Sequence, residues 1–353
     1  GNIEDFRAIH FSAVKAKKHF DLDDDEQKFY QAEVLVKNFI PLEYITNINN
    51  FGILIPNKPK QMQIKLPYTA QITRNTPTAF IFLIDHSVSM QNKTTLYGEE
   101  MTKAEAAARI VNAQINELVL RCIKMEDTRH YYDIAVIGYG EKAYSGWQGE
   151  LEGRDFVSPE ELKNHPYTKI ITRKEIRTRK GVQIKEIEQV QWITARHDGS
   201  WTHYHAAFDY AKELLDKWMT KHHEQDCYPP TIIHITDGWF NHASLDTVTQ
   251  KANELKAMFT NDGNVILFNI HFTADKDATP IACPISKLEL DDDYSKALFD
   301  MSSLLPERYN ADIARCLNDT RDGRHVAMGI NADASTLIKL MDIGTPTNIS
   351  QNK

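Results

Sequence analysis

Apolar runs that stop at or near acidic residues are the clearest pattern in this sequence. Residues 79–84 are continuously apolar and end at Asp85, and residues 231–235 end just before Asp237. Runs of this kind indicate strands that are buried on both faces, as in parallel sheets. Similar runs predict three further strands, over residues 132–138, 265–272 and 325–330.

Between these strands, apolar residues recur every three or four positions, which predicts helices. The helices that we expect cover residues 101–124, 206–218, 244–259, 311–317 and 334–341. Strands that alternate with helices predict an α/β fold, with a doubly wound, mostly parallel sheet and helices on both faces. Binding sites in such sheets form at the carboxyl ends of the strands.

The first part of the chain follows a different pattern. Strand-like alternation at residues 31–39 and 62–66 is interrupted by turns rich in Asn and Pro. We therefore expect an irregular β-containing N-terminal extension over residues 1–75 and a main domain over residues 76–345.

A basic insertion interrupts the main domain at about residues 163–190. Between Lys163 and Lys185 the chain has eight Lys and Arg residues and a single acid, Glu175, with apolar residues interleaved around Lys180-Gly181. This pattern predicts a β-hairpin. The hairpin is interpreted either as a solvated, charged ribbon or as a docking surface for an acidic or phosphorylated partner.

Composition and charge narrow the functional classes. The 353 residues are 42% hydrophobic and 25% charged, which is typical of a globular protein, and the net charge of −8 gives no support for nucleic-acid binding. No apolar run is long enough to span a membrane. The four cysteines are isolated, which favours a reducing cytoplasm over a disulfide scaffold, although an upstream targeting segment could precede Gly1.

Three loops at the ends of predicted elements carry oxygen ligands. Asp85, Ser87 and Ser89 alternate after the first strand, Gly199-Ser200-Trp201-Thr202 precedes a helix, and Thr236-Asp237-Gly238 follows another strand. Carboxylate and hydroxyl oxygens favour a hard cation, and few carboxylates with room for water suit Mg²⁺ or Mn²⁺.

These three loops, in this order, resemble the metal-ion-dependent adhesion site (MIDAS) of von Willebrand factor type A (VWA) domains. The resemblance covers roughly residues 76–343 and implies a Rossmann-like VWA fold. It also implies a partner protein whose Glu or Asp completes the metal shell. The implied metal ligands are Asp85, Ser87, Ser89, Thr202 and Asp237.

The second loop departs from the Gly-Gly-Thr of the family, so either Ser200 or Thr202 could be its ligand. We choose Thr202, because Ala207 and Phe208 then occupy the small and apolar positions that begin the family's helix. Trp201 and Trp239 flank the loops and form either a rim for partner contact or a cover for the sheet edge.

Histidines near the loops suggest zinc as an alternative metal. His86, His203 and His205 do not have a standard zinc spacing, and we interpret them as neutral surface residues.

Further resemblance points to a bacterial subgroup of VWA domains, similar to proteins associated with tellurite resistance. Its basis is the basic hairpin before the second loop, together with Asn331-Ala332-Asp333 and Asp342-Ile343-Gly344-Thr345. The resemblance implies a cytoplasmic protein that acts beside kinases and phosphatases.

The function that we favour is a non-catalytic, divalent-metal-dependent protein-binding module, because the loops offer ligands but no legible nucleophile or general base. The alternative from another class is a metal-dependent phosphohydrolase. Asp85 after a strand resembles aspartyl-phosphate enzymes, but Ser87 occupies the position where those enzymes use a second Asp. A third hypothesis is a signalling or stress-response scaffold that binds a kinase or phosphatase through the basic hairpin.

Overall fold

The computed structural model describes residues 67–96, 99–178, 181–197, 201–238, 240, 243–272, 280–319 and 321–330. The chain divides into two units, Gly1–Ile64 and Lys65–Lys353, and every described residue belongs to the second. Most of the expected N-terminal extension and the helix expected at residues 334–341 therefore lie outside the described residues.

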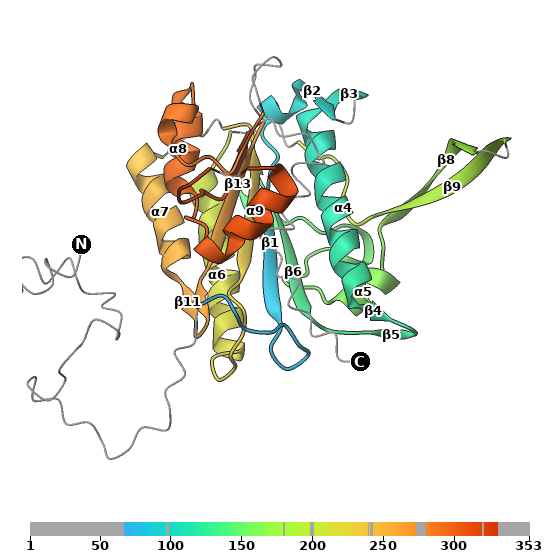
Figure 1. The fold of residues 1–353 in the computed structure, drawn as a ribbon, viewed down its shortest axis with the longest axis horizontal. Coiled ribbons are helices and arrows are strands. Elements are labelled where there is room, and N and C mark those ends of the chain that lie inside the picture. The colour runs from blue at the N-terminus through green and yellow to red at the C-terminus, as the bar shows by residue number, and fades with distance from the viewer. Residues whose placement is uncertain are drawn as a thin grey trace, which may run out of the picture. The chain divides into compact units, whose positions relative to one another are not determined.

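A seven-stranded sheet forms the centre of this unit (Figure 1). Five neighbouring strands are parallel, and the short strand at each edge is antiparallel. This confirms the predicted doubly wound, mostly parallel α/β sheet. In spatial order the strands are β14 (Ile281–Ala282), β15 (Met328–Ile330), β13 (Ile266–His271), β10 (Thr231–Thr236), β1 (Thr78–Asp85), β6 (Tyr132–Tyr139) and β7 (Ala143–Ser145).

The order of the strands creates a switch point between β1 and β10. From β1 the chain crosses to β6 on one side, and after β10 it continues to β13 and β15 on the other. Loops that leave β1 and β10 at their carboxyl ends diverge, and ligands bind in the crevice between such loops in open α/β sheets.

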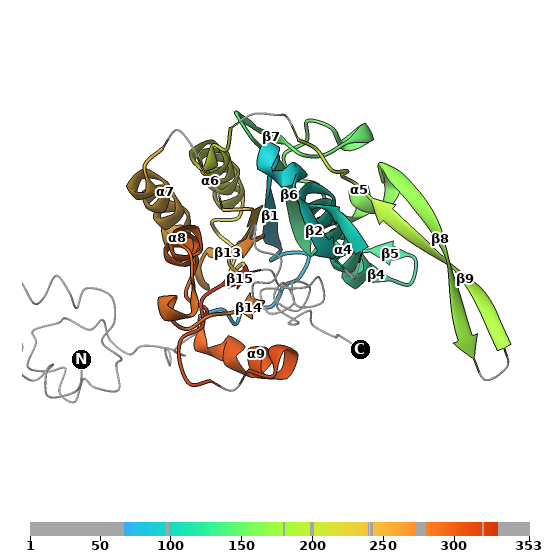
Figure 2. The same ribbon diagram turned by 90° about the horizontal axis from the view of Figure 1, so that it is seen from above.

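Two layers of helices cover the sheet. One face packs against α4 (Lys103–Cys122) and α9 (Asn310–Leu317), and the other against α6 (Tyr204–Lys221), α7 (Leu245–Ala257) and α8 (Asp293–Met301). Figure 2 shows α6, α7 and α8 together on one side of β1 and α4 on the other.

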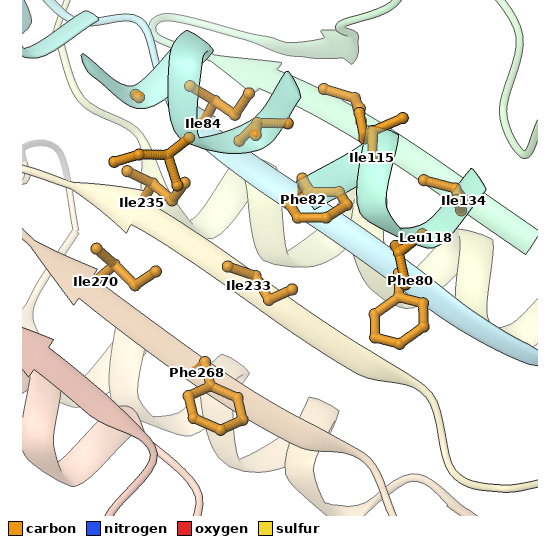
Figure 3. Packing of buried hydrophobic residues seen from close by; sticks show 14 of the residues in the cluster. Phe80, Phe82, Ile84, Ile115, Leu118, Ile134, Ile233, Ile235, Phe268 and Ile270 are labelled. Atoms are coloured by element: carbon orange, nitrogen blue, oxygen red, sulfur yellow. The ribbon is translucent and has the colours of Figure 1, made fainter. Parts of the chain in front are cut away.

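Burial on both faces explains why β1 is apolar from residue 79 to residue 84. Phe80 and Phe82 point into the layer beneath α4, whereas Ile81 and Leu83 point into the layer beneath α6. Figure 3 shows the first of these layers, where side chains from β1, β10 and β13 gather under α4. Each such aliphatic or aromatic side chain contributes about 1.5–3 kcal/mol through burial.

Several short elements were not predicted, because they are too short to show a period. Only two residues separate the strands of each short hairpin. The helix α5 begins with a capping box at Ser158 and Glu161, which is a signal that the sequence does contain. These elements are β2 (Lys93–Leu96), β3 (Glu99–Thr102), β4 (Ile123–Lys124), β5 (Asp127–Thr128), α5 (Pro159–Asn164), β11 (Phe259–Thr260) and β12 (Gly263–Asn264). Short 3₁₀ helices occupy Val88–Gln91, Gly149–Leu151, Lys287–Glu289 and Glu307–Tyr309.

The predicted basic hairpin is present as β8 (Thr168–Thr178) and β9 (Gly181–Gln191). The two strands pair in antiparallel register from Thr168↔Gln191 to Thr178↔Gly181. Figure 1 shows that this ribbon projects away from the sheet and its helices. Its backbone confirms a hairpin, and its role as a docking surface stays a prediction.

Within the described residues, no helix has both the length and the apolar character that would let it cross a bilayer. Cys122, Cys227 and Cys283 are buried and have free thiols, and the Cys316 side chain lies outside the described part.

A buried polar chain crosses the face of the sheet under α6. The Tyr139 hydroxyl lies 2.5 Å from Nε2 of His234, and His234 Nδ1 lies 2.7 Å from Oδ1 of Asn269. Because the amide oxygen only accepts, Nδ1 carries the proton and Tyr139 donates to Nε2. Both ring nitrogens are therefore satisfied by a neutral imidazole.

We predict that His234 makes the fold sensitive to acid. Burial lowers the pKa of His234 from 6.5 to about 4. Between these values the unfolded chain binds a proton at this imidazole and the folded chain does not. The free energy of unfolding therefore falls as pH decreases through this window, by a total of about 3 kcal/mol from this residue.

Denaturant unfolding measured across this pH window tests the prediction. The His234→Gln variant should lose part of the pH dependence, whereas His223→Gln, at a side chain that is 70% exposed, should keep it. Equal pH dependence in wild type and His234→Gln would contradict the assignment.

Candidate metal centre

The loops after β1 and β10 begin side by side at the switch point of the sheet. Ile84 pairs with Ile235 in parallel register, so Asp85 lies level with Thr236, and Asp237 follows one residue later. The structure thus places the two predicted carboxylates at the same edge of the sheet, on neighbouring strands.

Asp85 is fully buried and fixed through both of its carboxylate oxygens. Oδ1 accepts a hydrogen bond from the Ser87 amide at 2.9 Å, and Oδ2 accepts one from the Thr236 hydroxyl at 2.8 Å. The Thr236 hydroxyl has given its single proton to Asp85, so the Tyr204 hydroxyl, 2.6 Å away, donates to it. Thr236 and Tyr204 therefore position Asp85.

Sequence analysis missed these two positioning roles. Thr236 stands inside the third-loop motif, where its hydroxyl was not assigned, and Tyr204 resembles any aromatic residue at the start of a helix. Their side chains become informative only when β10 and α6 are placed beside β1.

Burial, and then the nearby charge of Asp237, raise the pKa of Asp85 from 3.8 to about 7. Hydrogen bonds from Ser87 and Thr236 oppose this shift. The charge of Asp237 disfavours ionisation of Asp85, and a cation between the two loops would favour the ionised form of Asp85.

The first loop turns directly after β1. A 3₁₀ helix over Val88–Gln91 follows Ser87, and the fully buried Met90 anchors that turn in the core. The hydroxyls of Ser87 and Ser89 lie 3.1 Å apart, so the two side chains point toward each other. Ser87 is buried, and Ser89 is partly exposed.

Asp237 has one paired and one unpaired oxygen. Its Oδ2 lies 3.4 Å from the Lys103 ammonium, whereas Oδ1 is buried and has no hydrogen-bond partner among the described residues. A buried carboxylate oxygen without a partner is costly. This oxygen fits a site for a cation, and the hydroxyl and carboxylate donors around it are those that hard divalent ions prefer.

Lys103 is a charged residue of this site that sequence analysis did not single out. It begins α4, only 2% of its surface is exposed, and its ammonium also donates to the Phe272 carbonyl at 3.1 Å. A lysine in the first turn of a helix is usually solvated, so the sequence gives no signal for this placement.

The second loop runs against the turn after β6. Thr202 is buried, and the next residue, His203, donates its amide to the Gly140 carbonyl at 3.0 Å. Trp201 is 62% exposed. The other candidates of this region, Ser200 and Trp239, lie outside the described residues, so the choice between Ser200 and Thr202 stays a prediction.

His86 is buried, and its prediction as a surface residue was wrong. Its ring packs on Gly138, where an added Cβ would meet it at 2.4 Å, and its Nδ1 lies 2.5 Å from the Tyr144 hydroxyl. In the described part of the chain, no three His, Cys, Asp or Glu side chains gather as a metal cluster. A site here would therefore depend on hydroxyl ligands together with the two carboxylates.

Comparisons with known proteins give two kinds of match. The family model described as "ssDNA thymidine ADP-ribosyltransferase, DarT" matches residues 1–65, a small part of the chain. Curated proteins give no match.

Among solved structures, proximal thread matrix protein 1 of the mussel byssus is 14% identical, with a TM-score of 0.41, and the match covers 78% of this chain and 49% of that one. A second structure of that protein, whose MIDAS motif is occupied by zinc, has 14% identity and a TM-score of 0.36, with 67% and 43% covered. A von Willebrand factor type A structure from Catenulispora acidiphila is 12% identical, with a TM-score of 0.38 and 78% and 43% covered.

The matched regions span less than half the length of each of these structures. Identities of 14% or less and TM-scores below 0.5 are too low to establish a family or a function for this chain.

We predict that Gly238 is required for the geometry of the third loop. Its φ is 91°, and a Cβ would lie 2.3 Å from Cε1 of the buried His271 ring. Gly238→Ala should lower the free energy of unfolding by about 2 kcal/mol or more, because it adds a clash to the backbone strain.

Gly153→Ala is the matched control, because Gly153 has a φ of 77° with nothing within 4 Å of an added Cβ. It should cost about 1 kcal/mol from backbone strain alone. Equal losses in the two variants, measured by chemical denaturation, would show that the contact with His271 imposes no constraint.

Proposed function

We propose that this protein is a non-catalytic protein-binding module that depends on a divalent metal, Mg²⁺ or Mn²⁺. A partner's Glu or Asp side chain completes the shell of the ion. The proposed ligands are Asp85, Ser87, Ser89, Thr202 and Asp237.

The observation that carries the proposal is the unpartnered, buried Oδ1 of Asp237 beside the buried carboxylate of Asp85. The carboxylates of Asp85 and Asp237 and the hydroxyls of Ser87 and Ser89 belong to the loops that leave β1 and β10 at the edge of the sheet. The metal, when bound, supplies the positive charge that these oxygens need and an open position for an acidic ligand. This agrees with the resemblance of the three loops to the MIDAS of VWA domains.

The contacts of the first loop favour binding over catalysis. Asp85 is held through both oxygens by Ser87 and Thr236, which suits a fixed ligand better than a group that must attack phosphorus. We therefore place the phosphohydrolase below the binding module.

Exposed apolar side chains border the site and would contact a partner. Val88 is 55% exposed in the first loop, and Trp201 is 62% exposed in the second. Trp239 belongs to the same proposed rim. Aromatic residues at a rim favour protein partners, because they contribute much of the binding energy in interfaces.

We also propose a second binding surface and a cellular context for this protein. The basic hairpin β8–β9 would give the protein a second surface, for an acidic or phosphorylated partner such as a kinase or phosphatase. The resemblance to a bacterial, cytoplasmic subgroup associated with tellurite resistance supports this setting, and its C-terminal motifs at residues 331–345 lie outside the described residues.

We predict that Asp85→Asn and Asp237→Asn each weaken Mg²⁺ and Mn²⁺ binding by more than about 100-fold, which exceeds the usual cost of losing an outer contact. Each change removes a negative charge and keeps the shape of the side chain. Isothermal titration calorimetry of the full chain measures both affinities.

Asp133→Asn is the control, because Asp133 is also a buried carboxylate but lies near the start of β6, bonded to Trp218 and His130. It should bind metal as the wild type does. Unchanged Mg²⁺ affinity in Asp85→Asn would refute the site, and metal-dependent turnover of a phosphate ester that Asp85→Asn abolishes would favour the hydrolase.

For the second loop, we predict that Thr202→Val weakens Mn²⁺ binding by about tenfold or more, because it removes a hydroxyl ligand and keeps the side-chain volume. Ser200→Ala should leave the affinity unchanged. The reverse result in the same titration would transfer the ligand role to Ser200.

A further inference from the structure

Lys103 places its ammonium group inside the candidate metal centre. Its side chain is 3% exposed and that of Asp237 is 1% exposed, so neither charge is screened by solvent as a surface ion pair would be. A buried lysine is rare and usually has a specific partner or task.

The ammonium group is held in place from several elements. The Lys103 amide donates to the Asn92 carbonyl just after the first loop, at 2.9 Å, and the preceding residue closes a capping box with Glu105. The ammonium itself reaches the Phe272 carbonyl at 3.1 Å, beyond the end of β13. The start of α4 and the buried side chain of Lys103 are therefore both hydrogen-bonded to segments next to the site.

If Lys103 were only a counter-ion for Asp237, several features of the site would be unexplained. The separation of 3.4 Å between Nζ and Oδ2 is longer than the roughly 2.7–2.9 Å of a strong charge-assisted hydrogen bond. Oδ1 of Asp237 has no partner among the described residues, and the site contains a second buried carboxylate, Asp85. One ammonium cannot balance two carboxylates.

Formal charges can be counted for the metal-loaded site. The carboxylates of Asp85 and Asp237 contribute two negative charges, and the ammonium of Lys103 contributes one positive charge. A divalent ion therefore brings the sum to one positive charge, which a single partner carboxylate neutralises. Without Lys103, the loaded site would already be neutral.

We propose that Lys103 determines the specificity of the site by keeping it positively charged when the metal is bound. Its charge weakens the affinity for the cation and strengthens the affinity for a carboxylate ligand. This inference rests on the proposed metal site and adds the reason why the partner's group must be anionic.

The test compares Lys103→Met, which removes the charge, with Lys103→Arg, which keeps it. Mn²⁺ affinity is measured by calorimetry. Acetate serves as the carboxylate probe, and its binding to the Mn²⁺-loaded protein is followed by the loss of water-proton relaxation enhancement. Lys103→Gln is a second neutral variant that can still donate a hydrogen bond, for use if Lys103→Met does not fold.

We expect the neutral variants to bind Mn²⁺ more tightly, by about tenfold or more, because repulsion by one close charge is removed. They should bind acetate more weakly. Without metal they should unfold at a lower temperature, because two buried carboxylates then lack any cation, and Mn²⁺ should raise that temperature more than it does in wild type. Lys103→Arg should resemble wild type in acetate binding.

Lys256→Met is the control, because Lys256 is a partly buried lysine that donates to the Ser302 and Asp300 carbonyls, outside the site. It should leave Mn²⁺ and acetate binding unchanged. Unchanged or weaker Mn²⁺ binding in both neutral variants, or unchanged acetate binding, would overturn the role of Lys103 while the metal site stands. A wild type that binds no Mn²⁺ would instead overturn the proposed function itself.

Discussion

Two carboxylates buried side by side at the carboxyl edge of the sheet are the constraint around which this site is organised. Parallel pairing of β1 with β10 brings Asp85 and Asp237 together, and burial denies them the water that would stabilise their charges. The surrounding groups partly satisfy the two carboxylates. The Ser87 amide and the Thr236 hydroxyl hold Asp85, and Lys103 approaches Oδ2 of Asp237. Oδ1 of Asp237 has no hydrogen-bond partner among the described residues.

The rest of the fold keeps that arrangement rigid. The apolar layers under α4 and α6 fix the two strands, and Gly238 lets the third loop turn directly against His271. Tyr204 links the start of α6 to Thr236, so the helix after the second loop also supports the first carboxylate. Side chains that are held by packed strands and helices keep a single geometry.

Much of this could be predicted from the sequence. Apolar runs identified all five parallel strands, because strands that are buried on both faces are apolar at nearly every position. The order of Asp85, Ser87, Ser89 and Asp237 along the chain predicts which loops carry the candidate site, and the parallel pairing of β1 with β10 makes two of these loops neighbours. What could not be predicted depends on contacts between distant elements. In the sequence, Lys103 looks like an ordinary helix lysine, and only the position of α4 beside the ends of β10 and β13 shows that it is buried. His86 likewise looks like a loop histidine, and only its contact with Gly138 shows that its ring is buried. Short elements such as β2 and β4 show no period at all.

The most direct measurement is a crystal structure of the full chain grown with Mn²⁺, with an anomalous difference map to locate the metal. We predict one strong peak between the loops after β1 and β10, in contact with Asp85, Asp237 and the first-loop hydroxyls, with Lys103 still buried next to it. A map without a peak there at saturating Mn²⁺, with both oxygens of Asp237 bound by protein groups, would contradict this prediction.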